Sequence, residues 1–419
     1  MSSAGQILAA REAHAKRAAE LAVHGGAVTI KANVPGCDKQ IRESALLVRY
    51  FAARVDEISG GPVILENSPD GFWAALPANG RFTKPDAVRL EESDEGGRFI
   101  DIDVYPADGT HSLTRGRLRR CYLCEKPAIV CARQRNHPVA DLQEAFRQGT
   151  RAFISRQLAA AVSYSITAEL DLEDKFGLVT PTSVGSHPDL NYDLMIKSRD
   201  AVIPGLVQMF WTGYDCGRER LLERIRIEGR AAEAAMYAAS GGVNTYKGLV
   251  FVAGVLLASA GCVLAENSKA DDIYDTAARI CSGITAELAE PGAEETFGRK
   301  AYRLYGVRGA RGQAEEGFPA VRRAEALIDG QFSPQSLKTA LCDIVGNIED
   351  TVLLKRSGTY EKYLYFKRLI SSADPQNKEK IKILTAECIK NNISIGGSAD
   401  LLIAGVLVKK IRGMWYFDE

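Results

Sequence analysis

The spacing of apolar and polar residues changes about a third of the way along the chain. Up to about residue 140, segments that alternate between apolar and polar residues stand between segments with helical spacing. They predict strands at residues 26–34, 72–76 and 98–106, and helices at residues 4–23 and 39–57. Beyond residue 140, helical spacing dominates and strand-like alternation nearly vanishes. The pattern thus predicts a multidomain protein, with an α+β domain at residues 1–145 and an all-α domain at residues 146–419.

The all-α part is predicted to be a long series of helices. Apolar positions three and four residues apart place them at residues 141–172, 190–213, 217–239, 247–266, 268–290, 319–329, 335–354, 359–372, 376–390 and 397–412. One of these helices contains the uncharged run Gly248–Ala265, which is about long enough to cross a bilayer. No second apolar span or basic flanking loop accompanies it, so we interpret it as a helix buried on all sides, in a protein without a membrane partner.

Length and charge limit the classes of function. A chain of 419 residues favours two or three domains over one. Lys plus Arg and Asp plus Glu both number 53, so the net charge gives no general attraction to nucleic acid or to an anionic membrane. Any phosphate site must therefore be local. The charged N-terminus lacks an apolar signal segment, and the nine Cys are an odd number, which together favour a cytoplasmic protein with reduced thiols.

Asp101 and Asp103 are the first candidate catalytic residues. They lie two positions apart in the predicted strand GRFIDIDVY, so their side chains should share one face, about 6–7 Å apart. Two carboxylates on one face can hold Mg²⁺ together with substrate phosphates, as a nucleotidyl-transferring site requires. The alternative is a half-buried strand with a solvated acidic face.

A second cluster in the first domain combines thiols with an imidazole. Cys121, Cys124, Cys131 and His137 could form a tetrahedral Zn²⁺ site of the Cys₃His type, or could be small thiols that pack a loop. Basic residues surround this segment, and they suit a polyphosphate substrate or a solvated surface: Arg115, Arg117, Arg119, Arg120, Arg133 and Arg135.

The motifs of the first domain resemble those of a known family. REAHAKRAAEL, KANVPGCDKQ, DGFWAAL, GRFIDIDVY and CYLC…CARQRNH occur in the order typical of apo-citrate lyase phosphoribosyl-dephospho-CoA transferases, over about residues 5–145. The resemblance implies a nucleotidyltransferase-like domain that joins a prosthetic group to a serine of the acyl carrier (gamma) subunit and releases pyrophosphate. It implies Mg²⁺ at Asp101 and Asp103, and a turn formed by Asn33, Gly36 and Lys39 in which Lys39 contacts phosphate.

Polar loops that contain glycine interrupt the predicted helices of the second domain. In SGGVNTYKG, Gly241, Gly242 and the following helix N-terminus offer backbone N–H groups for an anion, and Lys247 adds a charge. The spacing differs from that of a Walker A loop. IGGSAD has the same character, with Gly396, Gly397 and Ser398 ahead of a helix.

Acidic residues near these loops could bind a metal or polarise a hydroxyl group. They are Asp189, beside His187 and Asp193, Asp350, which lies six residues before Arg356, and Asp400 in the first turn of the last helix. The alternative is that each is a helix cap or a surface charge, which is the commoner role for any single one.

The second domain resembles triphosphoribosyl-dephospho-CoA synthases over about residues 150–412. The matching segments include GLVTPTSVGSHPDLNYDLM, YGVRGARGQAEEGFP, DTVLLKRSG and NNISIGGSADLLIAG. The chain departs from the usual pattern at Phe176, Thr180, Tyr246 and Val352. The resemblance implies that ATP and 3′-dephospho-CoA are substrates, that adenine leaves, and that the ribose 2′-hydroxyl attacks C1′. The chemistry of this reaction requires a base, a metal and phosphate ligands. We expect Asp189 as the base, Mg²⁺ at Asp350 and Asp400, and phosphate contacts from Gly241, Gly242, Asn244, Lys247 and Arg308.

The two resemblances together predict a bifunctional transferase that makes and attaches the citrate lyase prosthetic group. One alternative is the same chemistry on the related carrier of malonate decarboxylase, and the N-V-P-G and C-Y-L-C motifs favour citrate lyase. Another is a carrier-binding protein whose second domain has lost activity. Nucleic-acid binding is disfavoured by the zero net charge.

Overall fold

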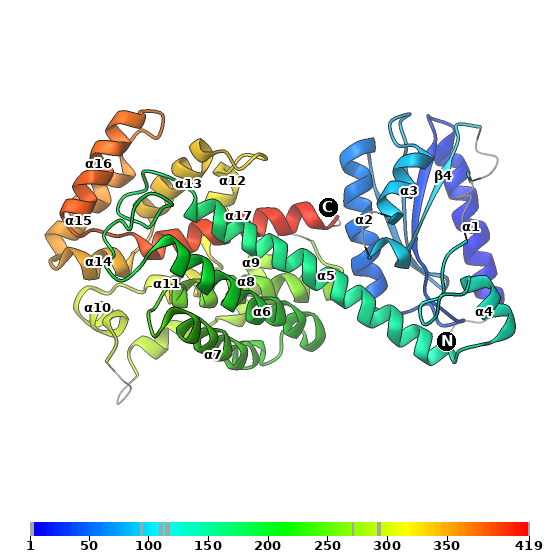
Figure 1. Ribbon diagram of the computed structural model, residues 1–419, viewed down its shortest axis with the longest axis horizontal. Coiled ribbons are helices and arrows are strands. Elements are labelled where there is room, and N and C mark those ends of the chain that lie inside the picture. The colour runs from blue at the N-terminus through cyan, green and yellow to red at the C-terminus, as the bar shows by residue number, and fades with distance from the viewer. Residues whose placement is uncertain are drawn as a thin grey trace. The chain divides into compact units, whose positions relative to one another are not determined.

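The computed structural model describes residues 4–92, 95–108, 112–113, 118–269, 272–290 and 295–417. The chain forms two compact units (Figure 1). The first contains Met1–Gln157 together with Arg412–Asp418, and the second contains Leu158–Ile411. The boundary expected after residue 145 lies within one continuous helix, α5 (Val139–Leu170).

The first unit is built on a four-stranded antiparallel sheet in the order β2-β3-β1-β4. Its strands are β1 (Ala27–Ala32), β2 (Ile64–Ser68), β3 (Gly71–Pro77) and β4 (Ile100–Tyr105). The three predicted strands are confirmed, and β2 is an additional strand that pairs with β3 across a tight turn. The edge strand β4 carries Asp101 and Asp103.

Helices cover the two faces of this sheet (Figure 1). The apolar face, which includes Val28, Ile30 and Ile102, is fully buried on the side of α2 (Glu43–Ser59). On the opposite face, His14 of α1 (Ala4–Ala22) stacks on Trp73 with ring centroids 4.3 Å apart. Two shorter helices, α3 (Lys84–Glu92) and α4 (Ala128–Gln134), complete the unit, and α3 packs against β4.

The C-terminal residues belong to the core of the first unit. Trp415 is buried and its indole N–H donates to Leu46 O at 3.1 Å. The backbone of Tyr416 exchanges hydrogen bonds with Arg49 of α2. The sequence pattern gives no sign of this return of the chain, because it depends on contacts across more than 360 residues.

The described part of the second unit is all helical, as predicted. After α5 come α6 (Tyr192–Cys216), α7 (Leu221–Ser240), α8 (Lys247–Glu266), α9 (Asp272–Ile280), α10 (Phe297–Tyr305), α11 (Gly309–Glu315), α12 (Pro319–Leu327), α13 (Pro334–Asn347), α14 (Thr351–Ser357), α15 (Tyr360–Ser371), α16 (Lys378–Lys390) and α17 (Gly396–Met414). The helix expected at residues 268–290 is shorter and ends before a 3₁₀ turn, and α10 and α11 were not predicted.

The apolar helix α8 lies in the core of the second unit. Among the described residues it is the one helix that is long and apolar enough to cross a membrane, and 83% of that apolar window is buried in the protein. It packs closely on α6. Side chains at Gly213 and Gly261 would meet backbone oxygens of the other helix at 1.9 and 2.1 Å, so only glycine permits this approach. The burial is that of a core helix, which is the interpretation the sequence favoured.

Candidate active sites

Asp101 and Asp103 share one face of the sheet, as predicted. In the register of β4 with β1, Asp101 lies opposite Lys31 and Asp103 lies opposite Thr29. The side chain of Asp101 is 45% exposed. Asp103 is half-buried, and burial together with the nearby Asp101 charge raises its pKa. The two carboxylates are therefore close enough to repel each other, which favours a cation between them.

Side chains satisfy the free edge of β4. Glu91 of α3 accepts a hydrogen bond from Ile102 N at 2.8 Å, and Lys84 donates to Ile102 O at 3.0 Å. The guanidinium of Arg119 bonds to Asp101 at 2.6 Å and to Glu91 at 3.0 Å. These contacts fix the strand that carries the acidic pair, and they give Asp101 a protein cation as partner.

A cluster of cations lies on the same face as the acidic pair. Lys31 and Arg11 both pair with the side chain of Asp70, which is fully buried in the turn between β2 and β3. Burial, then the charges of Arg11 and Lys39, lower the pKa of Lys31 to about 8. Burial and Arg11 also lower the pKa of Lys39. Since the cations repel one another, the cluster favours an additional anion such as a phosphate.

The predicted turn after β1 is present next to this cluster. The side chain of Asn33 donates to Ile100 O at 2.9 Å and so joins the turn to β4. Gly36 has a φ of +80°, and a Cβ there would lie 2.4 Å from Val139 Cγ1, so the turn requires glycine. The ammonium of Lys39 donates to Val34 O. Arg115 lies outside the described residues.

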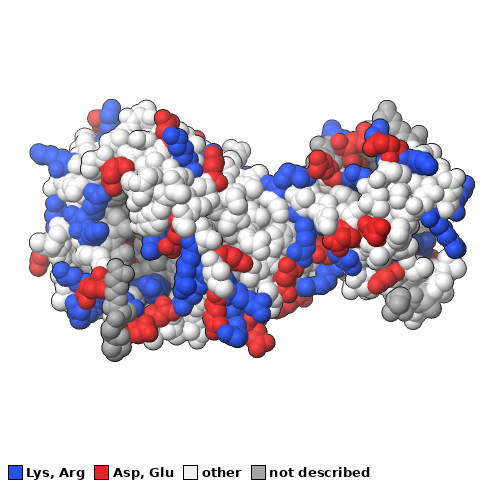
Figure 2. All heavy atoms as spheres, turned by 60° about the horizontal axis from the view of Figure 1, so that its bottom comes forward, with Lys and Arg blue, Asp and Glu red and all other residues white. Residues whose placement is uncertain are grey.

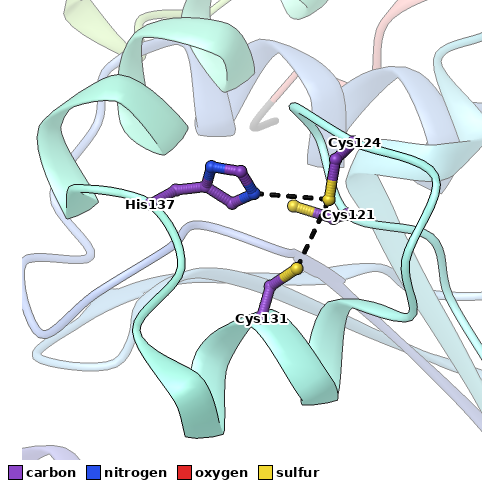
Figure 3. Close-up of side chains that lie close together, drawn as sticks. All are labelled: Cys121, Cys124, Cys131 and His137. Carbon is purple, nitrogen blue, oxygen red and sulfur yellow. Dashed lines mark hydrogen bonds between the residues drawn. The ribbon is translucent and has the colours of Figure 1, made fainter.

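The three Cys residues and His137 come together in the first unit (Figure 3). Their ligand atoms all lie within 4.8 Å of one another. Cys124 Sγ is 3.4 Å from Cys131 Sγ and 3.3 Å from His137 Nε2. Among the described residues, this is the one group of three or more His, Cys, Asp or Glu side chains that converges closely enough to hold a metal ion by itself.

In the second unit, the four glycine-containing loops singled out in the sequence contribute to one cavity of about 640 Å³. These loops supply His187 and Asp189, Asn244 to Gly248, Gly309 with Gln313, and Gly396 with Asp400. The cavity lining is rich in acids, namely Glu169, Asp189, Glu349, Asp350 and Asp400. Residues that are more than 200 positions apart therefore line a single site.

Asp350 holds two helix ends together beside this cavity. One carboxylate oxygen accepts from the N–H groups of Val352 and Leu353, so Asp350 is the N-cap of α14. The other oxygen accepts from the N–H and the hydroxyl of Ser398 at 2.8 and 2.7 Å. This cap also explains why the helix predicted at residues 335–354 is divided into α13 and α14.

Among the described residues, Asp400 has no such set of donors. It faces the cavity, which leaves part of its surface accessible, and it lies so close to Gly248 that a Cβ there would be 2.1 Å from its Oδ2. Burial, then the charges of Asp350 and Glu169, raise its pKa well above the usual range. Burial and the neighbouring acids thus oppose ionisation of Asp400, and a cation beside it would favour the ionised form.

Tyr246 lines the same cavity. It is 2% exposed, and its hydroxyl has no hydrogen-bond partner within the described structure. Burial, with the charges of Glu169 and Asp400, raises its pKa well above the usual range, so the hydroxyl keeps its proton. An unpaired buried hydroxyl costs stability, which points to a role with a ligand. The sequence identified Tyr246 only as a departure from its family's pattern.

Ion pairs and hydrogen bonds fix the loops around the cavity. Lys175 is fully buried and bonds to Glu169 at 2.8 Å. Arg356 donates to His187 Nδ1 at 2.8 Å, so His187 Nε2 carries the proton and donates to Ser394 Oγ at 2.7 Å. Burial and Arg356 lower the pKa of His187 to about 4, which keeps the imidazole neutral.

A second cavity of about 450 Å³ shares Lys247, Gly248, Gly309, Ala310 and Thr351 with the first. Its lining is basic, with Arg226, Arg230, Lys247, Arg308 and Arg311 against the acids Glu233 and Glu287. Elsewhere, Lys/Arg and Asp/Glu are interspersed on the face of the molecule shown in Figure 2. This cavity is a local group of cations on a protein without net charge, which is the kind of site that the sequence predicted for phosphate.

The loop before α8 differs from the prediction in one respect. Gly241 and Gly242 both donate their N–H groups to Tyr237 O and terminate α7. The expectation that these N–H groups are free for an anion was wrong, because positive φ angles of 68° and 93° serve a helix C-cap here. Asn244 accepts from Lys247 N at 3.1 Å, and Lys247 itself pairs with Glu233 at 3.3 Å.

The first unit carries a carboxylate pair on the edge strand of a sheet, and the second carries two adjoining cavities, one rich in acids and one rich in arginines. Residues 155–418 match the family described as ATP:dephospho-CoA triphosphoribosyl transferase, and residues 2–153 match the family described as apo-citrate lyase phosphoribosyl-dephospho-CoA transferase. The chain belongs to the first of these families, in the fused form that carries a domain of the second ahead of it.

Similar proteins support the fusion. Over 399 residues the chain is 29% identical to Protein CitXG of Leuconostoc mesenteroides subsp. cremoris, covering 86% of this chain and 83% of the relative. It is 27% identical to Protein CitXG of Haemophilus influenzae over 379 residues, 83% of this chain and 81% of the relative. It is 32% identical to 2-(5′′-triphosphoribosyl)-3′-dephosphocoenzyme-A synthase of Haemophilus ducreyi, over 67% of this chain and 96% of that protein.

The prediction of a bifunctional enzyme is thus confirmed: the protein synthesises the citrate lyase prosthetic group and attaches it. The matched families favour citrate lyase over malonate decarboxylase. The transferase family implies an acyl carrier as protein partner.

Proposed function

We propose that the acidic cavity of the second unit is where the ribose of ATP is transferred to 3′-dephospho-CoA. The observation that carries this proposal is the pair of adjoining cavities, one lined by acids and the other by arginines. The basic cavity suits the phosphates of ATP, which do not react. Lys247 lines both cavities, so it lies where the phosphates and the reacting sugar would meet. Arg308 lines the basic cavity and remains a phosphate ligand in this proposal.

The reaction breaks the bond between adenine and C1′ of the ATP ribose and forms a bond from C1′ to the 2′-oxygen of dephospho-CoA. Asp189 lies exposed on the cavity lining, where it takes the proton of the attacking hydroxyl. The hydroxyl of Tyr246 keeps its proton and donates a hydrogen bond to a ring nitrogen of the departing adenine. Adenine leaves with the bonding electron pair, and the triphosphate is retained.

Mg²⁺ is the metal we propose for this cavity, with Asp400 as its protein ligand. The expected second ligand, Asp350, instead serves as a buried helix cap, because its two oxygens already accept four hydrogen bonds. Mg²⁺ is commonly held by one or two carboxylates plus substrate phosphates, and it neutralises the charge of the triphosphate. The raised pKa of Asp400 fits such a site, since a carboxyl group that is costly to ionise alone is stabilised as an anion by a cation. Gly396, Gly397 and Ser398 begin the helix beside it, and Ser398 positions Asp350.

In the first unit we propose a nucleotidyltransferase-like site at Asp101 and Asp103. The carboxylates would hold Mg²⁺, while Lys31 and Lys39 contact the phosphates of the prosthetic-group precursor. A serine hydroxyl of the acyl carrier gamma subunit gives up its proton and attacks the phosphorus that is bonded to the ribose taken from ATP. A phosphodiester forms between serine and this ribose, and pyrophosphate leaves. Asn33 and Gly36 shape the turn that carries Lys39.

We further propose that the protein is cytoplasmic, like the nucleotide substrates it uses, with no membrane or nucleic-acid partner.

We propose Mg²⁺ as the ion beside the reacting phosphates, because the oxygen ligands that it prefers are present at both sites. Zn²⁺ prefers thiols, which these two sites lack among their proposed ligands. The two units act in sequence, since the product of the second is the substrate of the first.

One incubation tests both halves of the proposal. Purified chain is mixed with ATP, Mg²⁺, 3′-dephospho-CoA and the apo-carrier, and free adenine and carrier mass are measured. We expect adenine in step with a mass gain of one phosphoribosyl-dephospho-CoA group per carrier. Adenine without a mass gain would overturn the role of the first unit, and no adenine would overturn the role of the second. The apo-carrier of malonate decarboxylase serves as the matched control and should gain less.

A further inference from the structure

The Cys and His cluster of the first unit has the geometry of a closed metal site. Cys121 and Cys124 lie in the loop before α4, Cys131 lies within α4, and His137 follows it (Figure 3). Cys121 and Cys131 are each 4% exposed, so two of the four ligand side chains are shielded from water. All four ligand atoms lie within 4.8 Å of one another, so one ion could contact all of them.

The individual distances are close to those of a tetrahedral zinc site. With Zn–S near 2.3 Å and Zn–N near 2.0–2.1 Å, tetrahedral angles place two sulfurs about 3.8 Å apart and a sulfur and nitrogen about 3.6 Å apart. The structure has 3.4 Å between Cys124 and Cys131 and 3.3 Å between Cys124 and His137. A disulfide between the two Cys would need about 2.05 Å and would leave Cys121 and His137 without a role.

A hydrogen bond to one of the sulfurs is of the kind that stabilises a bound thiolate. Asn136 Nδ2 donates to Cys131 Sγ at 3.7 Å. Such donors orient thiolate ligands and stabilise their negative charge. Small thiols that merely fill a loop have no need for amide donors.

We propose that Cys121, Cys124, Cys131 and His137 bind one Zn²⁺ ion, and that this ion positions two groups of the transferase site. The occupied loop is a structural zinc site with all four positions taken by protein, and the metal takes no part in bond making. The positioning part of the proposal rests on the proposed function of Asp101 and Asp103, and the metal part stands without it.

The contacts of the loop define what zinc would position. Arg119 lies two residues before the first ligand, and Ala128 N donates to its carbonyl at 2.8 Å, while its guanidinium holds Asp101. Tyr122 lies between the ligands, and its hydroxyl donates to Asn33 O at 2.7 Å, at the start of the turn that carries Lys39. Loss of the ion would loosen the loop that carries both contacts, which is otherwise held by the bond of Arg98 to Cys121 O at 3.0 Å and by packing of Tyr122 on Phe99.

The first measurement is the metal content of the intact chain. We expect about one Zn²⁺ per chain by elemental mass spectrometry after purification without chelator, as four protein ligands imply. Cys124→Ser and His137→Ala should lose most of it, whereas Cys216→Ser, a thiol of the second unit, should keep it. His137→Cys should retain zinc in a Cys₄ site and so separates ligation from simple misfolding. Wild-type chain without zinc, or zinc loss in Cys216→Ser, would overturn the proposal.

The second measurement separates positioning from ligation. In the Cys124→Ser chain we expect carrier modification to fall at least tenfold, mainly as a rise in KM for the precursor, with adenine release unchanged. His137→Cys should restore carrier modification. If His137→Ala loses zinc but modifies carrier normally, the ion does not position the site, although it binds. If wild-type chain binds zinc but modifies no carrier, the proposed function of the first unit fails and the zinc site remains.

Discussion

The two candidate sites differ in what surrounds the carboxyl group that would bind a metal ion. In the first unit, Asp101 is 45% exposed on an edge strand and is paired with Arg119. In the second, Asp400 lies within a cavity among other acids, and its pKa is raised well above the usual range. One site presents charges that the protein has already balanced with partners. In the other, burial and neighbouring acids oppose the ionisation of a carboxyl group.

This difference follows from the two architectures. An edge strand offers alternating side chains to a partly open face, so long cationic side chains such as Lys31 and Arg119 can reach the acids. A helical unit brings together the ends of helices instead, as at Asp350 and Ser398, where backbone N–H groups supply the partners. The first site should therefore depend most on charge pairs, and the second on the cavity that surrounds it.

The largest expected effect is that of Asp101→Asn on the first site. This change removes a ligand charge from the proposed Mg²⁺ site, so carrier modification should fall on the order of 10³-fold, since metal-ion catalysis contributes several kcal/mol and 1.36 kcal/mol is tenfold in rate. Adenine release should be unchanged. The two activities are measured by carrier mass and free adenine.

The control for that prediction is Glu125→Gln, another carboxylate of the same unit, which is exposed and bonds to Arg120 at 2.7 Å. It should leave both activities intact. A folded Asp101→Asn chain that loses adenine release as well would contradict the division of labour between the units.

Lys247→Ala should have the next largest effect, on the second site alone. Loss of one charged hydrogen bond to phosphate costs about 1.5–3 kcal/mol, or on the order of 100-fold in kcat/KM for adenine release. Carrier modification from supplied precursor should not change. Lys247→Arg should recover part of the activity.

The matched control is Glu233→Gln, which removes the ion-pair partner of Lys247 without removing the cation. If Glu233→Gln and Lys247→Ala reduce adenine release equally, the lysine acts by fixing the loop, and its proposed contact with phosphate is wrong.

The sequence predicted the strand of the first candidate site better than the side chains that contact it. The strand with Asp101 and Asp103 could be recognised because apolar and polar residues alternate in it. Its partners could not, because Arg119 and Glu91 belong to charged segments without periodicity and act through contacts 11 to 28 residues away along the chain. The helix that supplies Glu91 was not predicted for the same reason, since five of the nine residues of α3 are charged.

In the second unit, glycine was an ambiguous signal. Gly241 and Gly242 resembled an anion-binding turn, and they terminate a helix instead, because both uses require the same positive φ angles. The loops with Asp189, Lys247 and Asp400 were correctly singled out as polar clusters. That they line one cavity with Glu169 and Tyr246 depends on tertiary packing, which no local pattern encodes.

Tyr246→Phe should have a smaller effect on rate and a diagnostic effect on stability. Because the hydroxyl has no partner within the described structure, its removal should leave the free energy of unfolding unchanged or raise it by up to ~1 kcal/mol. Adenine release should fall about tenfold in kcat, the usual size of one hydrogen bond made in the transition state. Thermal unfolding and single-turnover adenine release measure the two effects. A destabilised variant with full activity would show that the hydroxyl serves the fold.

The smallest expected effect is a pH dependence that comes from His187. Its pKa is lowered to about 4, by burial first and then by Arg356, against an unfolded value near 6.5. The folded state therefore binds fewer protons than the unfolded state between pH 4 and 6.5. The stability that the neutral imidazole contributes is complete above pH 6.5 and is lost as the pH falls through this window.

Three other groups face His187 and could alter this window. Arg356 and Ser394 hold the ring in its neutral form, while the charge of Asp189 raises the pKa slightly. The His187→Gln variant can accept from Arg356 and donate to Ser394 without titrating, so its urea midpoint should change less between pH 4.5 and 7 than that of the wild type. We expect a difference of about 1–2 kcal/mol after allowance for solvent exposure. If the urea midpoints of the two chains change equally with pH, the imidazole is not held neutral by its neighbours. The contacts of His187 would then not fix the loops around the acidic cavity in the way that Arg119 fixes the strand of the first site.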